Sequence, residues 1–298
     1  MKNVWLPQNL TQLWACLDNE PDARFFAGGT DLLVQMRSRK VEAAAWIGLE
    51  KINEIKGIDE DKGSIRIGAC VTHAQLLRHP LIAGKLSLLH KAIATLGSPP
   101  IRTMGTIGGN ICTASPAGDT LPPLYVLQAE VEIASFKGTQ RLPIRDFISG
   151  PGRTKLQQGE ILAAIHIKPS SGTDLHHFEK VGQRKSMCCA IASFAALWSL
   201  SSSGRIEKAR LAWGSVGPTI VMDQDIEGFL IGKKLTRETL DRAAQLVEQR
   251  VAPIDDVRAS ADYRRKVSGH LLLRLLHFTQ GCAHSHIRDK GVADPPIG

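Results

Sequence analysis

The strongest candidate for a binding site in this sequence is the segment Ala27-Gly28-Gly29-Thr30-Asp31, which follows a short apolar run. The residues after it, beginning with Leu32, are typical of a helix. The N-terminus of a helix presents unpaired N–H groups and about half a positive charge, and glycines let the backbone approach a phosphate closely. The segment therefore predicts an anion site, with a ligand-free strand-to-helix turn as the simpler alternative.

A second pair of glycines lies in Thr106-Ile107-Gly108-Gly109-Asn110, where backbone N–H groups, a hydroxyl and an amide side chain come together. Arg102 and Thr103 add a cation and another hydroxyl nearby. Two such segments in one chain predict two contacts on one extended anionic ligand, such as a dinucleotide. Neither segment matches GxGxxG or GxxxxGK(S/T), so we expect neither a Rossmann nucleotide site nor a phosphate loop.

The other reactive side chains form no recognisable metal or nucleophile site. The six cysteines fit neither a disulfide framework nor a CxxC metal site. His73, His79 and His90 lack the spacing of metal ligands, so we expect satisfied surface or core histidines. No GxSxG segment marks a serine nucleophile. We therefore predict no metal site and no catalytic side chain in this chain.

Composition indicates a globular protein: 298 residues, 43% hydrophobic and 22% charged. The net charge of +8 suits an anionic cofactor. Nucleic acid is disfavoured because Lys and Arg form no dense run and aromatic residues are only 5%. No apolar stretch is long enough to span a membrane, and residues 1–12 lack a secretory signal, so we expect a cytoplasmic protein.

The elements that must position the two glycine segments follow from periodicity. An amphipathic helix over 9–17, capped by Asn9, and short strands predict a small α/β unit in residues 1–60. The pattern then changes to strands, two helices and a long loop rich in glycine and proline, over which little periodicity remains. The predicted strands are 24–27, 45–49, 64–69, 130–136, 140–143 and 161–167, the helices are 72–77 and 88–96, and the loop is 97–123.

A domain boundary is predicted at 169–173, where Pro, Ser, Gly and Thr cluster. Three strands and two long helices follow, and the polar residues after Gly281 predict a flexible tail. Strands grouped beside helices indicate a mixed α/β or α+β protein. The predicted strands are 175–181, 190–200 and 205–213, and the helices are 236–251 and 258–279.

The two glycine segments, in this order and at this separation, resemble the FAD-binding subunits of the molybdenum hydroxylases. This family includes xanthine dehydrogenase, aerobic carbon monoxide dehydrogenase and 4-hydroxybenzoyl-CoA reductase. The resemblance extends through 111–119, 159–162, 178–181 and 256–264, and so covers nearly the whole chain to about residue 280.

The resemblance implies an α+β fold with an FAD-binding domain over 1–170, divided into a small α/β part (1–60) and a larger, mostly antiparallel part (61–170). A C-terminal domain over 174–280 would pack an antiparallel sheet against helices. Residues 281–298 would remain as the tail.

The resemblance also implies roles for individual residues. The backbones of Ala27 to Asp31 and of Thr106 to Asn110 would cradle the pyrophosphate of FAD. Asp119 would hydrogen-bond FAD, Leu162 would pack on it and Lys180 would place a cation near the flavin. Asp119 as a helix cap and Lys180 as a solvated lysine are the structural alternatives.

By the same resemblance, FAD is bound here without covalent attachment, and partner subunits carry the molybdopterin cofactor and two [2Fe–2S] clusters. Electrons would pass from molybdenum through the clusters to FAD and then to NAD+ or another acceptor, most closely as in a xanthine dehydrogenase. A non-catalytic scaffold subunit and a stand-alone flavin oxidase are the alternatives.

The sequence departs from the family in two places. Met187-Cys188-Cys189 stands where relatives often carry an acidic and then an aliphatic residue, so the loop beside the flavin is expected to differ. The cysteine-rich insertion that holds an extra four-iron cluster in the benzoyl-CoA reductase relative has no counterpart here. We therefore predict no cluster in this chain.

Overall fold

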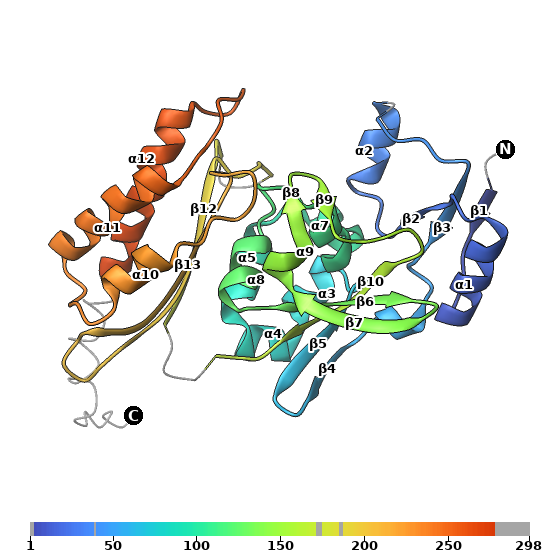
Figure 1. Cartoon of the computed structure of the whole chain (residues 1–298), viewed down its shortest axis with the longest axis horizontal. Helices are drawn as coiled ribbons and strands as arrows, with labels where there is room; N and C mark the ends of the chain where they lie inside the picture. The colour runs from blue at the N-terminus through green and yellow to red at the C-terminus, as the bar shows by residue number, and fades with distance from the viewer. Residues whose placement is uncertain (1–2, 39, 171–174, 185–186, 278–298) are drawn as a thin grey trace, which may run out of the picture.

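A computed structural model describes residues 3–38, 40–170, 175–184 and 187–277, and Figure 1 shows how they are arranged. The described residues form four sheets: a parallel one near the N-terminus, a five-stranded antiparallel one, a small two-stranded one, and an antiparallel one of three strands. Helices cover them in layers. The predicted α+β fold is confirmed.

The N-terminal unit is a three-stranded parallel sheet, in the order β1-β3-β2, that packs against one helix. Asn9 caps that helix by accepting from the backbone N–H of Gln12, as predicted, and Leu13 is buried under it. The C-terminal end of β2 leads directly into the first glycine segment. The elements are β1 (Asn3–Trp5), α1 (Leu10–Asn19), β2 (Arg24–Phe26), α2 (Leu32–Arg37), β3 (Ala45–Gly48) and η1 (Asn53–Ile55).

The middle unit is built on an antiparallel sheet in the order β4-β5-β10-β6-β7. Its central strand, β10, is buried along its whole length. The strands are β4 (Ile58–Asp61), β5 (Ser64–Gly68), β6 (Glu130–Ser135), β7 (Gly138–Pro143) and β10 (Ile161–Ile167), with β8 (Ile148–Gly150) and β9 (Arg153–Thr154) forming the small sheet. The helices are α3 (His73–Arg78), α4 (Pro80–Lys85), α5 (Ser87–Thr95), α6 (Pro99–Met104), α7 (Ile107–Thr113), α8 (Leu121–Val126) and α9 (Ile144–Phe147).

The predicted long loop over 97–123 is wrong, because the segment contains the short helices α6 and α7 and the start of α8. Proline occupies the first turn of both α6 and α8, a position where its missing N–H has no cost. Thr106 caps α7, whose first turn holds the second pair of glycines. Residues typical of loops therefore start helices here.

The C-terminal unit is an antiparallel sheet in the order β11-β12-β13 with helices on one face. Phe194, Trp198 and Trp213 pack under those helices, while Ala195 and Leu197 from the other face join the core of the middle unit. Figure 1 shows the sheet between its own helices on one side and helices α5 and α8 of the middle unit on the other. The elements are β11 (Leu175–Val181), β12 (Ala192–Leu200), β13 (Ile206–Gly214), α10 (Gln224–Leu230), α11 (Arg237–Arg250), α12 (Ala261–Leu272) and η2 (Leu273–Leu276).

Most of the predicted domain boundary, and the predicted tail, fall on residues outside the described part of the chain. Helix α12 begins at Ala261, capped by Ser260, three residues later than predicted. In the described residues, no helix combines the length and the apolar character that crossing a bilayer requires.

Candidate functional site

Both glycine segments line one cavity of about 720 Å³. The cavity is bounded by the end of β2 and the start of α2, by α6 and α7, and by the loop that leads into β12. This volume lies within the range of ligand pockets, about 300–1,000 Å³. Its lining residues are 25–32, 35, 73, 96–98, 101, 105–106, 109–110, 112–113, 115, 117–119 and 187–189.

The first glycine segment offers a row of free donors to this cavity. Among the described residues, no acceptor is found for the six consecutive backbone N–H groups from Ala27 to Leu32. Gly29 has a φ of +69°, a conformation that glycine adopts without strain. Backbone polar groups are rarely left unpaired, so this row indicates a site for an anionic ligand.

Gly28 is needed for close backbone packing, whereas Gly29 is needed for its positive φ. A Cβ atom on Gly28 would lie 1.7 Å from the carbonyl oxygen of Met104 and 3.1 Å from the N of Gly105. The first glycine segment therefore packs directly against the residues that precede the second. Gly28 allows this approach, and Gly29 supplies the turn toward the cavity.

In the second segment, the backbone N–H groups of residues 107–110 already have partners. Ile107 donates to the carbonyl of Val71, Gly108 to that of Ala69, and Gly109 to the hydroxyl of Thr106 at 3.1 Å. A Cβ on Gly108 would lie 2.6 Å from that of Ala69, so this glycine serves close packing. The second segment thus shapes the cavity wall, and it offers fewer free donors than predicted.

Two polar side chains connect the segments. Asp31 Oδ2 accepts hydrogen bonds from Thr113 Oγ1 at 3.1 Å and from Gln35 Nε2 at 2.7 Å, which ties α2 to α7. Thr120 Oγ1 donates to Asn110 Oδ1 at 2.5 Å, which leaves the Asn110 NH₂ group as a donor at the cavity. Asp31 therefore aligns the two segments.

Asp119 and Lys180 form a buried ion pair at the cavity, with Nζ and Oδ2 2.6 Å apart. Their side chains are only 8% and 7% exposed, and Asp119 Oδ1 has no partner among the described residues. Burial raises the pKa of the Asp119 carboxyl, and the Lys180 ammonium opposes that rise. Asp119 makes no capping bond to α8. Both alternatives, a helix cap and a solvated lysine, are wrong.

Four predicted site residues do not line the cavity. Ile107 and Gly108 are buried against the residues that follow β5, Lys180 reaches the site only through Asp119, and Leu162 is 4% exposed in the core. Ala27, Gly28, Gly29, Thr30, Asp31, Thr106, Gly109, Asn110 and Asp119 do line it.

His73 lines the cavity and was missed by the sequence analysis. It is 2% exposed, and its Nδ1 is buried without a partner among the described residues, so the expectation of a satisfied histidine is wrong. Its backbone N–H donates to the carbonyl of Gly105, which brings it beside the second segment. Burial and the nearby Arg102 lower the pKa of His73 to about 4, which keeps the ring neutral.

We predict that His73 makes stability fall in acid. Its pKa is about 4 when folded and about 6.5 when unfolded, so the unfolded chain binds the extra proton between these values. The free energy of unfolding should drop by about 3 kcal/mol from this group as pH falls from about 6.5 to 4. Urea unfolding at several pH values checks this, with His73→Gln as the comparison. Parallel pH curves for the two proteins would contradict it.

The loop before β12 contributes Met187, Cys188 and Cys189 to the cavity wall. Cys188 Sγ donates to the carbonyl of Arg184 at 3.1 Å, and Met187 has a φ of +54°. Cys112 of α7 lines the same cavity. In the described part of the chain, no group of three His, Cys, Asp or Glu residues could hold a metal ion. The arrangement is suited to holding an elongated anionic molecule.

Comparison with known families matches both halves of the chain. The family described as the FAD binding domain in molybdopterin dehydrogenase matches residues 1–170, and the CO dehydrogenase flavoprotein C-terminal domain matches residues 177–279. The putative xanthine dehydrogenase FAD-binding subunit of Escherichia coli (strain K12) is 33% identical over 251 residues, 83% of this chain and 85% of that protein. The carbon monoxide dehydrogenase medium chain of Afipia carboxidovorans is 31% identical, over 85% of this chain and 87% of its own.

Solved structures agree with these matches. Quinoline 2-oxidoreductase from Pseudomonas putida 86 superposes with a TM-score of 0.89 at 28% identity, covering 95% of this chain and 99% of its own. Reconstituted CO dehydrogenase from Oligotropha carboxidovorans gives a TM-score of 0.88 at 29% identity, covering 93% and 96%.

Proposed function

The chain belongs to the family of FAD-binding subunits of the molybdenum hydroxylases, and we propose that it holds FAD non-covalently in the cavity between its glycine segments. The six unpaired backbone N–H groups from Ala27 to Leu32 carry this proposal. A diphosphate offers several anionic oxygens to such a row of donors, and the glycines keep side chains out of the way. When bound, FAD supplies the electron carrier.

Asp119 supports the same assignment. Its Oδ1 is a buried acceptor at the cavity without a partner among the described residues, and leaving such an atom unpaired is costly. A hydroxyl or N–H group of FAD would satisfy it. The Lys180 ammonium on Oδ2 fixes the carboxylate in place. Thr30 and Asn110 add further hydrogen-bonding groups along the wall. Leu162 lies in the core, so the proposal gives it no contact with FAD.

The partners in this proposal are a subunit with two [2Fe–2S] clusters and a subunit with the molybdenum cofactor. Exposed apolar residues on the segments that bound the cavity fit a docking face for the iron–sulfur subunit: Leu33, Val34, Ile101, Met104 and Met187, each 40–62% exposed. Large apolar side chains left exposed beside a binding site fit such an interaction surface. The chain would receive electrons from the clusters there.

The complex we propose is a cytoplasmic, xanthine dehydrogenase-like enzyme that delivers electrons to NAD+ or another acceptor. The 33% identity with the xanthine dehydrogenase subunit supports this choice. The organic substrate would be selected on the molybdenum subunit. Co-purification from the native host, followed by assays with xanthine and NAD+, tests this part, and a complex inactive on xanthine would overturn it.

We predict that the purified chain is yellow and releases about one FAD per chain on denaturation. The physical reason is the row of backbone donors without a protein partner at the start of α2, where a diphosphate would be bound by several N–H groups at once. Absorbance at 450 nm and chromatography of the released flavin measure the content. A colourless protein that takes up no FAD on titration would overturn the assignment and favour a scaffold role.

A further inference from the structure

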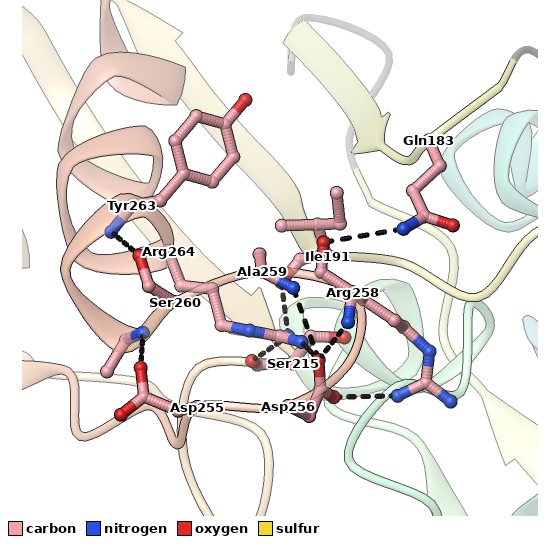
Figure 2. A network of polar contacts seen from close by, with 11 residues as sticks. Gln183, Ile191, Ser215, Asp255, Asp256, Arg258, Ala259, Ser260, Tyr263 and Arg264 are labelled. Atoms are coloured by element: carbon pink, nitrogen blue, oxygen red, sulfur yellow. Dashed lines mark hydrogen bonds and ion pairs between the residues drawn. The ribbon is translucent and has the colours of Figure 1, made fainter.

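Residues 255–264 form a polar network between the loop after α11 and the first turn of α12, shown in Figure 2. Asp255 Oδ1 accepts from the N–H of Ala261 at 2.6 Å, and Ser260 Oγ accepts from that of Tyr263 at 3.2 Å, so both hold the start of α12. None of these residues lines the cavity. The network therefore needs an explanation other than direct contact with a ligand.

Arg264 is the centre of this network, although it is only 3% exposed. Its Nη1 donates to the carbonyls of Ile191 at 2.7 Å and Ser215 at 3.1 Å, and its Nη2 donates to Asp256 Oδ1 at 2.6 Å. These partners are the residue just before β12, the residue just after β13 and an aspartate in the loop before α12. A buried guanidinium is tolerated only with such partners. Arg264 therefore ties three separate segments together.

Asp256 is held ionised by the same network. Burial raises the pKa of its carboxyl, but hydrogen bonds from the Arg258 backbone N–H and the Arg264 guanidinium outweigh this effect and lower the pKa to about 2. Arg258 Nη1 also donates to Oδ2 at 2.8 Å. The carboxylate thus keeps its charge, and its ion pair with Arg264, across the working pH range.

The two carbonyls that Arg264 holds adjoin the cavity wall. Ile191 lies two residues beyond Cys189, which lines the cavity. Ser215 donates its N–H to the carbonyl of Pro116 at 2.8 Å, and Pro116 lies within the lining segment that ends at Asp119. One buried side chain therefore supports two wall segments from outside.

We propose that Arg264, held by Asp256, is a positioning residue that sets the 115–119 and 187–189 walls of the cavity. The proposal rests on FAD being the ligand of that cavity. Through it the C-terminal unit controls FAD affinity, although Arg264 touches no ligand. Arginine is required because the N–H groups of its planar guanidinium bond a carboxylate and two carbonyls at once. A lysine has a single ammonium nitrogen on a shorter side chain, so it cannot make all three contacts.

The test compares Arg264→Lys with Arg265→Lys, a neighbour on α12 whose side chain is 36% exposed. FAD affinity is measured by fluorescence titration, and labelling of Cys188 with a maleimide is followed by mass spectrometry of the apoprotein. We expect Arg264→Lys to weaken FAD binding by about tenfold or more, since it loses charge-assisted hydrogen bonds. Cys188, half-buried in the wild type, should label several-fold faster, and Arg265→Lys should change neither quantity.

Wild-type FAD affinity and labelling in a folded Arg264→Lys protein would overturn the proposal. If Arg264→Lys does not fold, Asp256→Asn decides by the same two measurements, because it weakens the grip on Arg264 and keeps its carbonyl contacts. A lower melting temperature with unchanged FAD affinity and unchanged labelling also overturns it, since that pattern indicates general stabilisation only. If the wild type itself takes up no FAD, the proposed cofactor fails, and the Cys188 labelling still tests the positioning role.

Discussion

Replacing Gly28 with alanine is expected to remove FAD from the protein and to lower its free energy of unfolding by about 1–3 kcal/mol. The added Cβ would lie 1.7 Å from the carbonyl oxygen of Met104 and 2.5 Å from its carbonyl carbon, so one backbone must move. Either movement displaces the free N–H groups of Ala27 to Leu32 from their present row. Flavin content after purification and the midpoint of urea unfolding measure the two effects.

Two other glycines serve as controls for this variant. Gly84 lies in α4 with no atom within 4 Å of an added Cβ, so Gly84→Ala should keep FAD and gain up to about 1 kcal/mol. Gly29→Ala adds no backbone clash but places alanine at a φ of +69°, which costs about 1 kcal/mol or more. A Gly28→Ala protein with wild-type flavin content would show that the close approach to Met104 is not needed for the site.

The sequence predicted well the elements whose apolar residues follow a clear period. The helix at 236–251 has a threonine cap at Thr236 and buries one face, and α11 occupies 237–250. Strand β11 has the predicted bounds. The strands β1 and β4 were missed because they are exposed edge strands that show no alternation. Helices α6 to α8 were missed because packing of residues such as Ile111 and Leu124, both fully buried, outweighs weak local propensity.

The sequence predicted which segments form the site, but it did not predict which residues line the cavity and which pack behind it. Both glycine segments reach one cavity, as the presence of two such segments in one chain predicted. The packing of each glycine depends on a residue far from it in the sequence: Gly28 packs against Met104, and Gly108 packs against Ala69. His73 reaches the cavity because its N–H bonds to Gly105, a contact with no local signal. Such pairings follow from tertiary structure, so a single sequence does not reveal them.

The Asp119–Lys180 pair gives the second large prediction. Asp119→Ala leaves the Lys180 ammonium 7% exposed and without its carboxylate, which should cost about 3–5 kcal/mol of unfolding free energy. Lys180→Met should cost less at low pH than at high pH. Without the ammonium, the pKa of the buried Asp119 rises further, so the carboxyl becomes neutral as pH falls and the penalty for burying its charge disappears. Urea unfolding at pH 5 and pH 8 measures both variants.

The double variant Asp119→Ala/Lys180→Met separates stability from cofactor binding. Removing both charges leaves no buried ion unpaired, so its loss of stability should be smaller than the sum of the single losses by more than about 1 kcal/mol. FAD affinity should not recover, because the acceptor Oδ1 is still missing from the cavity. Strictly additive losses would show that the two side chains act independently despite their 2.6 Å contact. Restored FAD binding in the double variant would show that Asp119 serves the C-terminal sheet alone and accepts no hydrogen bond from the cofactor.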